Sequence, residues 1–209
     1  MAELLLIRHG ETVWNREARV QGHRGDSPLT ETGRAQARAL AGRLAREGIN
    51  ALYSSDAGRT RETVAPIAQA TGFDVVFDAG LRERNYGVFE GRTYKEIERE
   101  FPEQYAKFRS RDPNHASPGG ESATQFRDRI VAALTAIAEK EADERIAVVT
   151  HGGVLGTMHK VASGAPLDAK RDYSLYNASI NIFRYDAGRW IMQTWGDVAH
   201  YPAASLDEL

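Results

Sequence analysis

The 209-residue sequence contains no cysteine, which excludes disulfides, thiolate metal sites and thiol nucleophiles. Long hydrophobic runs are also missing: the first apolar run, Leu4 to Ile7, ends at Arg8 and is far too short for a secretory signal or a membrane span. Neither sign of charge dominates, since 27 Lys and Arg stand against 29 Asp and Glu. No overall basic field therefore favours nucleic acid or acidic lipid. These absences predict a cytoplasmic protein that binds neither nucleic acid nor membrane and whose anion-binding sites are local.

The length and composition fit one globular domain with a sizeable core, because 42% of the residues are hydrophobic and no repeat or linker divides the chain. We therefore predict a single domain over residues 1–209. The stretch from about 91 to 118, rich in charge and aromatic residues, is predicted to form a small helical cap. Four of the six histidines lack metal-ligand spacing with each other or with carboxylates, so no metal site is predicted from them: His23, His115, His159 and His200.

Strand and helix patterns alternate along the chain. Apolar runs without polar alternation predict buried strands at 4–7, 51–55, 75–77 and 146–150. Helical spacing of apolar residues predicts helices at about 30–46, at about 59–70 and in a long segment after Ser122. Near the C-terminus, two strand-like segments joined by a tight turn predict a hairpin over 180–185 and 190–195. This order predicts an α/β fold with three αβα layers, a mostly parallel central sheet and an antiparallel edge strand.

Two of the predicted strands end in a histidine followed by glycine. His9-Gly10 follows the first strand, and His151-Gly152-Gly153 follows the strand at 146–150. In open α/β sheets ligands bind at the carboxyl ends of the strands, so both imidazoles are expected to reach one crevice. The glycines would let the backbone approach a ligand closely. One such histidine is weak evidence, but the second copy in the same context favours a functional site.

Arginine is found in the same places. Arg8 precedes the first of these histidines, and Arg59 and Arg61 begin the helix after the second strand. The dipole of a helix disfavours a cation in its first turn, unless an anion is bound there by the free N–H groups. Guanidinium groups also match the geometry of phosphate oxygens. We therefore predict that Arg8 and Arg59 face an anionic ligand, whereas Arg61 is a solvated surface charge.

These motifs resemble the signature of the histidine phosphatase superfamily, which includes the cofactor-dependent phosphoglycerate mutases. The first block is Leu6-Ile7-Arg8-His9-Gly10-Glu11-Thr12, followed by Trp14-Asn15. The other blocks follow in the family's order: Gln21-Gly22, Pro28-Leu29-Thr30 with Gly33, Ser54-Ser55-Asp56 with Arg59 and Thr63, Leu81-Arg82-Glu83 with Tyr86-Gly87 and Glu90-Gly91, and Val149-Thr150-His151-Gly152-Gly153. The resemblance spans about residues 4 to 155.

The resemblance implies that His9 is the nucleophile and that one of its ring nitrogens attacks phosphorus. It also implies that Arg8, Arg59 and a protonated His151 surround the phosphoryl oxygens. Phosphoryl transfer needs little more than in-line positioning and stabilisation of charge on those oxygens, and these cations would supply it without a metal.

The family places its general acid at the position of Glu83. A free carboxyl is ionised at neutral pH, so this role requires surroundings that raise the pKa of Glu83 or a proton shared with the substrate. The same carboxylate would then deprotonate the water that attacks phosphohistidine. The alternative is a loop carboxylate paired with Arg82 or Arg84. Further residues are expected to bind the substrate, Asn15 as a neutral donor to the phosphate: Asn15, Gln21, Gly22, Tyr86 and Gly152.

Within the family, the sequence favours a phosphatase for small phosphorylated metabolites that needs no cofactor. The interval from Gly91 to Gly119 is short, Arg109 and Arg111 are separated where mutases have adjacent arginines, and the tail 202–209 contains no lysine. The sequence of the segment from Glu83 to Gly87 is more similar to that of the mutases than to that of many phosphatases, so a mutase primed by 2,3-bisphosphoglycerate is the alternative. A catalytically weak regulatory or binding member is a third possibility, but it would lack a core residue, and none is missing. The identity of the phosphorylated substrate, including a sugar bisphosphate or a phosphoprotein, stays open.

Three features leave alternatives open. A row of aromatic residues either lines a pocket or packs in a core: Trp14, Tyr86, Phe89, Tyr94, Phe101, Tyr105 and Phe108. Four cations of the predicted cap either bind a second anionic group of the substrate or form a solvated face: Lys95, Lys107, Arg109 and Arg111. The exposed edge of the C-terminal hairpin would permit a homodimer through strand pairing.

Overall fold

The computed structural model describes residues 1–23 and 25–201, and in this part of the chain six strands form one sheet in the order β3-β2-β4-β1-β5-β6. The strands are β1 (Ala2–Arg8), β2 (Ala51–Ser54), β3 (Val75–Phe77), β4 (Arg145–Thr150), β5 (Ile180–Asp186) and β6 (Arg189–Asp197). β1 to β4 are parallel, whereas β5 and β6 run antiparallel at one edge. The predicted mostly parallel sheet with an antiparallel edge is confirmed. β6 is the outer strand of that edge, and the homodimer through it stays a prediction.

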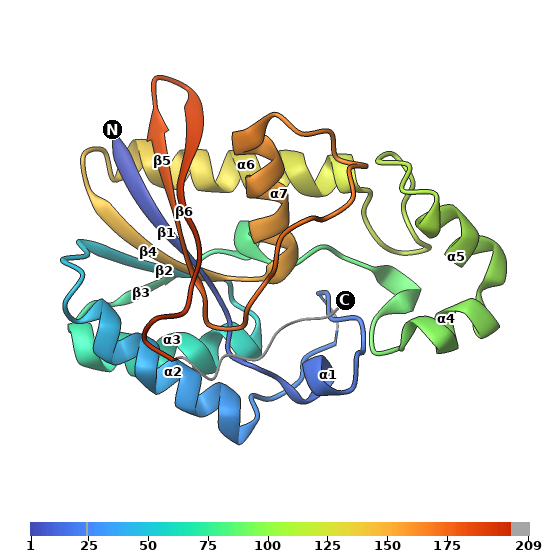
Figure 1. The fold of residues 1–209 in the computed structure, drawn as a ribbon, viewed down its shortest axis with the longest axis horizontal. Helices are drawn as coiled ribbons and strands as arrows, with labels where there is room; N and C mark the ends of the chain where they lie inside the picture. Colours follow the sequence, from blue (N-terminus) through green and yellow to red (C-terminus); the bar gives the residue numbers. More distant parts are fainter. Residues whose placement is uncertain (24, 202–209) are drawn as a thin grey trace.

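Helices cover both faces of this sheet (Figure 1). α2 (Glu31–Leu44) and α3 (Gly58–Thr71) lie on one face, and α6 (Ala123–Lys140) and α7 (Gly152–Ser163) lie on the other. The predicted three αβα layers are therefore confirmed. Local sequence fixes where two of the helices begin, because Thr30 accepts the N–H of Gly33 and Ser122 forms a capping box with Gln125. Among the described residues, no helix combines the length and the apolar composition that a membrane crossing requires.

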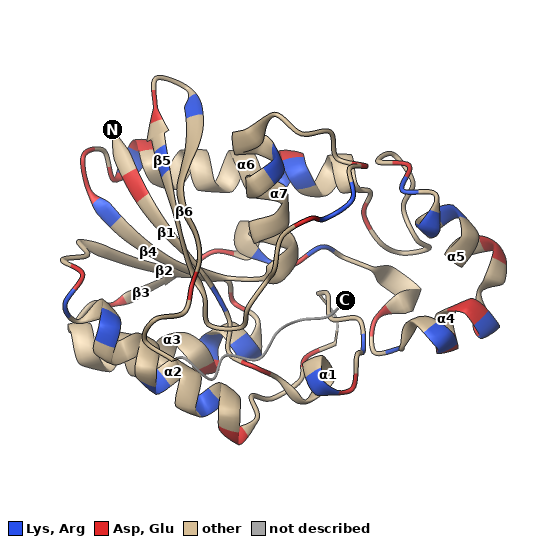
Figure 2. Cartoon of the chain, in the orientation of Figure 1, with Lys and Arg blue, Asp and Glu red and all other residues tan. Residues whose placement is uncertain are grey.

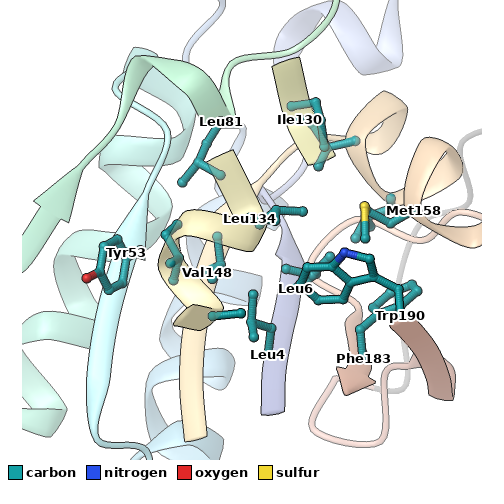
Figure 3. Close-up of a cluster of buried hydrophobic side chains, with 14 of the residues drawn as sticks. Leu4, Leu6, Tyr53, Leu81, Ile130, Leu134, Val148, Met158, Phe183 and Trp190 are labelled. Atoms are coloured by element: carbon teal, nitrogen blue, oxygen red, sulfur yellow. The ribbon is translucent and has the colours of Figure 1, made fainter. Parts of the chain in front are cut away.

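The core lies on both sides of the central strand β1. Leu4 and Leu6 pack toward α6 and α7, whereas Leu5 and Ile7 pack toward α2 and α3. Successive side chains of a strand point to opposite faces, so a strand covered on both faces has no polar alternation. Figure 3 shows part of the first cluster, which includes Ile130, Leu134, Val148, Met158 and Phe183. This packing holds the carboxyl end of β1 rigidly beside that of β4.

Leu134 tests this packing, because it is fully buried on α6 against β1 and β4. Leu134→Ala is expected to lower the free energy of unfolding by about 3 kcal/mol, since the lost apolar burial leaves a cavity in a close-packed layer. Urea denaturation followed by circular dichroism measures the change. Ala132→Gln on the exposed side of α6 is the control and should change stability by less than about 0.5 kcal/mol. A loss as small as that of the control in Leu134→Ala would contradict the packing.

Two short helices, α4 (Tyr94–Glu100) and α5 (Pro102–Arg109), extend from one end of the sheet (Figure 1). They have a small core of their own, made of Val20, Phe89 and Ile97. Most of the aromatic row packs around that core: Tyr86, Tyr94, Phe101, Tyr105 and Phe108. Helix α1 (Val13–Arg16) and two single-turn helices, Ala79–Leu81 and Gly87–Phe89, complete the regular structure of the described residues. The aromatic row is therefore mainly core, and only Tyr86 and Tyr94 of this group also line the cavity described below.

Candidate active site

The two histidine motifs meet at the carboxyl ends of β1 and β4. These strands are adjacent and parallel, and Arg8 pairs with Thr150, so the residues that follow them emerge side by side. The rings of His9 and His151 lie edge to face with centroids 5.5 Å apart. A cavity of about 330 Å³ opens here. Most of the predicted site residues line it: Arg8, His9, Asn15, Gln21, Arg59, Glu83, Tyr86 and Gly152.

His9 is almost fully buried, and its ring is oriented by the backbone. Its Nδ1 lies 2.8 Å from the carbonyl oxygen of Gly10. That oxygen can only accept, so Nδ1 carries the proton and Nε2 keeps its lone pair. Burial, followed by the positive charges of Arg59 and Arg8, holds the pKa of His9 well below its usual value. The imidazole is therefore neutral at neutral pH, with a nitrogen able to act as a nucleophile.

Arg59 lies in the first turn of α3, the position predicted for an anion-binding arginine, and its side chain is 1% exposed. Its Nη1 donates to Asp26 Oδ1 at 3.2 Å, and its Nη2 donates to the carbonyl oxygen of Gly22 at 3.2 Å. Asp26 also accepts the backbone N–H of Arg59 at 3.4 Å, so one negative charge already lies at this helix end. Gly22 consequently supports Arg59 from behind the cavity wall. The Nε atom of Arg59 has no hydrogen-bond partner among the described residues.

The other two arginines of the motifs differ in position. Arg8 lines the cavity, and its Nη1 donates to the carbonyl oxygen of Leu175 at 2.8 Å. Arg61 lies outside the cavity, where its guanidinium stacks 3.9 Å from the centre of the Phe77 ring and donates to the carbonyl oxygen of Asp56. The structure thus brings Arg8 and Arg59 together and leaves Arg61 on the surface.

His151 is fully buried behind His9 rather than on the cavity wall. Its Nε2 lies 2.9 Å from Ser55 Oγ, and its Nδ1 has no hydrogen-bond partner in residues 1–23 and 25–201. Burial and the positive charge of Arg59 hold the pKa of His151 well below its usual value. These surroundings favour the neutral imidazole, which differs from the protonated form that the family resemblance implies. The sequence could not reveal how completely this ring is desolvated.

Glu83 lines the cavity beside the first turn of α7 and is 8% exposed. Its Oε1 accepts the backbone N–H of Arg84 at 2.8 Å, and its Oε2 accepts that of Gly153 at 2.7 Å. The alternative of a side-chain pair with Arg82 or Arg84 is wrong, because Arg82 pairs with Asp56 and Arg84 donates to backbone carbonyls. Burial raises the pKa of Glu83, and the two backbone N–H groups oppose that rise.

Gly153 is a site residue that the sequence interpretation missed, although it stands in the motif after His151. A Cβ atom at this position would lie 2.1 Å from Glu83 Oε1. Only glycine therefore lets the first turn of α7 approach the carboxylate closely enough to donate its N–H. The second glycine of the motif was the available signal.

Asn15 and Gln21 are oriented through their carbonyl oxygens. Asn15 Oδ1 accepts the backbone N–H of Thr12 at 3.1 Å and the amide of Asn177 at 3.3 Å. The Thr12 hydroxyl lies 3.0 Å from Asn15 Oδ1 and 3.0 Å from Gln21 Oε1. Because the Asn15 oxygen faces two N–H donors, its NH₂ group is directed away from them and is available to an anion in the cavity, which the Gln21 side chain also lines.

The wall of the cavity that α7 and the following segment form was not predicted from the sequence. It is formed by one side of α7 and by the segment that follows that helix: Gly153, Gly156, Thr157, Lys160, Leu167, Ala169, Arg171, Tyr173 and Leu175. Of the four cap cations, Arg111 lines the cavity, whereas Lys95, Lys107 and Arg109 do not. Trp14 also lies elsewhere, against Gly91. Within the described ranges, no group of three or more His, Asp or Glu side chains is arranged to hold a metal ion.

The fold and the site define a protein that acts on phosphate esters. A family profile described as "Histidine phosphatase superfamily (branch 1)" matches residues 4–198. The chain belongs to this superfamily of enzymes, as the sequence motifs predicted.

Individual relatives agree with this assignment over nearly the whole chain. "Phosphoglycerate mutase-like protein 4" of Arabidopsis thaliana is 42% identical over 203 residues, which cover 95% of this chain and 86% of that protein. The structure of Bacillus stearothermophilus YhfR matches with a TM-score of 0.88 and 35% identity, covering 96% of this chain and 99% of that chain. A mutant phosphoserine phosphatase of Entamoeba histolytica, in complex with phosphoserine, matches with a TM-score of 0.84 and 26% identity, covering 96% and 100%.

Proposed function

We propose that this protein hydrolyses phosphomonoesters of small metabolites through a phosphohistidine on His9, without a metal ion. One observation carries this conclusion: the hydrogen bond from Nδ1 to Gly10 leaves the Nε2 lone pair of His9 available in a cavity that Arg8 and Arg59 also line. The membership of the superfamily supports it. The working unit is one domain, with residues from about 91 to 118 as its cap.

In the first half-reaction, His9 Nε2 attacks phosphorus in line with the ester oxygen, so an N–P bond forms as the P–O bond breaks. Arg8 and Arg59 stabilise the charge on the equatorial oxygens, and the amide groups of Asn15 and Gln21 donate to the same oxygens. His151 does not line the cavity, so its Nδ1, which has no partner among the described residues, becomes a further ligand only for a phosphate bound against the His9 ring; a dianion there would raise the pKa of the His151 ring. The N–H of Gly152 at the start of α7 completes the set of donors.

Glu83 serves both half-reactions. Its raised pKa favours the protonated carboxyl, which gives its proton to the leaving alkoxide. The resulting carboxylate then takes a proton from water as the water oxygen bonds to phosphorus and the N–P bond breaks. His9 returns to its neutral form, Glu83 regains its proton and inorganic phosphate leaves. Gly22 holds Arg59, and Tyr86 borders the organic part of the ester.

The mutase alternative differs only in the fate of the phosphohistidine, which would pass its phosphoryl group to a second phosphoglycerate instead of water. The name of the Arabidopsis relative is consistent with this alternative. A mutase of this kind would need 2,3-bisphosphoglycerate as its priming cofactor. The short cap, with α4 and α5 as its helices, and the phosphoserine phosphatase among the structural matches favour hydrolysis. The terminal segment 202–209, whose composition also counts against a mutase, lies outside the described residues.

A paired assay on the pure protein separates these reactions. With EDTA present, we expect phosphate release from p-nitrophenyl phosphate and from a panel of phosphorylated metabolites, at the same rate as without EDTA. Conversion of 3-phosphoglycerate to 2-phosphoglycerate, primed with 2,3-bisphosphoglycerate, is expected to be slow by comparison. Efficient conversion with little phosphate release would establish a mutase. A rate lost in EDTA and restored by a divalent cation would contradict the mechanism without metal.

A further inference from the structure

The segment that carries Glu83 has no regular secondary structure. It covers residues 82–86, here called the acid loop, between the single-turn helices Ala79–Leu81 and Gly87–Phe89. The two oxygens of Glu83 accept backbone N–H groups, one from Arg84 in the same loop and one from Gly153 on α7. The carboxyl therefore keeps its place against α7 only if the backbone of the acid loop is held in position by other groups.

Arg129, on α6, holds the first part of this backbone. Its Nη1 donates to the carbonyl oxygen of Gly80 at 2.8 Å and to that of Arg82 at 3.0 Å. Its Nη2 donates to the carbonyl oxygen of Glu83 at 3.1 Å. Backbone carbonyls that no strand or helix pairs need such partners, and here one side chain supplies three of them. A single guanidinium thus joins the acid loop and the helix turn before it to α6.

Glu121 holds the end of the acid loop and orients Arg129. Its Oε1 accepts Arg129 Nη2 at 2.6 Å, and its Oε2 accepts Arg129 Nε at 3.3 Å. The same Oε1 accepts the backbone N–H of Asn85 at 2.8 Å, and the backbone N–H of Glu121 donates to the Asn85 carbonyl at 2.9 Å. Two bonds to one carboxylate fix the plane of the guanidinium. The loop is therefore held on both sides of Glu83.

The bonds of Arg129 serve the protein and not a ligand. A guanidinium has five N–H donors, and those of Arg129 have five acceptors, which are the two Glu121 oxygens and the three carbonyls. Arg129 is also not among the residues that line the cavity. Figure 2 shows charged residues of both signs on the N-terminal part of α6. Arg127, two residues away on this helix, is more exposed and pairs with the neighbouring Asp128.

Helix α6 lies very close to the start of the acid loop. A Cβ atom on Gly80 would lie 2.9 Å from the Cβ atom of Ala133, so only glycine permits this approach without a shift. On its other side, Arg129 Nη2 lies 3.3 Å from Nε2 of His23, in the segment that includes Gly22. Arg129 is therefore placed where α6, the acid loop and the segment behind the phosphate site meet.

We propose that Arg129, oriented by Glu121, is a positioning residue that holds the Glu83 carboxyl against Gly153, within reach of the leaving-group oxygen. This inference rests on the proposed function, because it takes Glu83 to be the proton donor. Arg129 acts through Glu83, so its loss should impair the proton transfer and spare the binding of the phosphate. A displacement of about 1 Å is enough to lower a rate by up to about 10²-fold.

The dependence on the leaving group tests this role. Glutamine is too short and has too few donors to replace the guanidinium, so Arg129→Gln should lower kcat/KM for alkyl phosphates by about 10- to 100-fold. The rate with p-nitrophenyl phosphate should change by less than about threefold, since nitrophenolate leaves without a proton. The inhibition constant of inorganic phosphate should not change. Arg127→Gln is the matched control on the same helix and should keep both rates. Equal losses for both esters would show a role in the fold alone and overturn the proposal.

Two further variants separate positioning from a general loss of structure. Arg129→Lys keeps the charge beside Glu121 and can still donate to part of the loop, so it should recover part of the rate with alkyl esters. Because Arg129 acts through Glu83, adding Arg129→Gln to Glu83→Gln should slow alkyl esters by less than about threefold more than Glu83→Gln alone. Losses that multiply in the double variant would place the effect of Arg129 elsewhere and contradict the proposal.

Hydrogen exchange measures the position of Glu83 without turnover. The N–H of Gly153 lies in the first turn of α7, where it has no partner within the helix, and Glu83 accepts it. In Arg129→Gln this amide should exchange at least about tenfold faster by NMR, and in Arg127→Gln at the wild-type rate. If the wild-type protein released phosphate from no ester, the hydrolysis proposed at His9 would fail, yet faster exchange at Gly153 would still support the positioning of Glu83. An unchanged exchange rate in Arg129→Gln would overturn the positioning, whatever the turnover.

Discussion

Replacing His9 by alanine is expected to reduce phosphate release by more than about 10⁴-fold, because removal of a covalent nucleophile leaves only binding and charge stabilisation. The fold should survive the change. The backbone N–H of His9 still donates to Thr150 and its carbonyl still accepts from Asn177, and both bonds are independent of the imidazole. Steady-state phosphate release and acid-quenched labelling with a radioactive ester measure turnover and phosphoenzyme together, and both should vanish.

Chemical rescue supplies the control for this variant. In His9→Gly, free imidazole can enter the space of the side chain and attack the ester, so added imidazole should restore part of the rate. Thermal denaturation should give a Tm close to that of the wild-type protein, which excludes misfolding as the cause of the loss. Retained turnover in His9→Ala, or a label that stays on the protein, would move the nucleophile to another residue.

The sequence predicted the centre of this site because its geometry follows from the sheet. Buried apolar runs identified β1 and β4, and the carboxyl ends of parallel neighbours lie together, so His9 and His151 were expected to meet. The first-turn position of Arg59 carried a similar signal, because a cation at the positive end of a helix needs an anion. The structure showed that Asp26 supplies part of that anion.

The rest of the site depends on contacts between distant segments, which local patterns do not encode. Gly153 meets Glu83 across 70 positions, and Arg111 meets Ala169 across 58. The segment from 164 to 175, after α7, has neither a motif nor a regular pattern, so nothing in it indicated the second wall of the cavity. The protonation state of His151 could not be predicted from the sequence either, since it depends on how completely the ring is buried. Likewise, only packing decided that Tyr94 is the aromatic residue of the cap that reaches the cavity.

Replacing Glu83 by glutamine is expected to slow esters of alkyl alcohols by about 10²- to 10⁴-fold, because the glutamine amide cannot protonate the leaving alkoxide. The effect on p-nitrophenyl phosphate should be much smaller, since nitrophenolate leaves without a proton. Glutamine has nearly the shape of glutamate and can still accept one of the N–H bonds that Arg84 and Gly153 donate. The measurement is kcat/KM for a series of esters ordered by the pKa of the leaving alcohol. Glu100→Gln on the exposed surface of the cap is the control and should leave the series unchanged.

The pH profile gives a second readout for the same residue. Burial raises the pKa of Glu83, so its acid form persists above the usual range for a carboxyl, and kcat/KM for alkyl esters should fall as pH rises through that raised pKa. The lowered pKa of His9 keeps its nitrogen unprotonated to lower pH, so the two shifts together widen the range of pH in which both groups are in their active forms. In Glu83→Gln the alkaline fall should disappear, whereas a structural role would lower the whole profile without changing its shape. Equal losses for alkyl and nitrophenyl esters, together with an unaltered profile, would therefore remove Glu83 from the proton transfer and leave it as a support for α7.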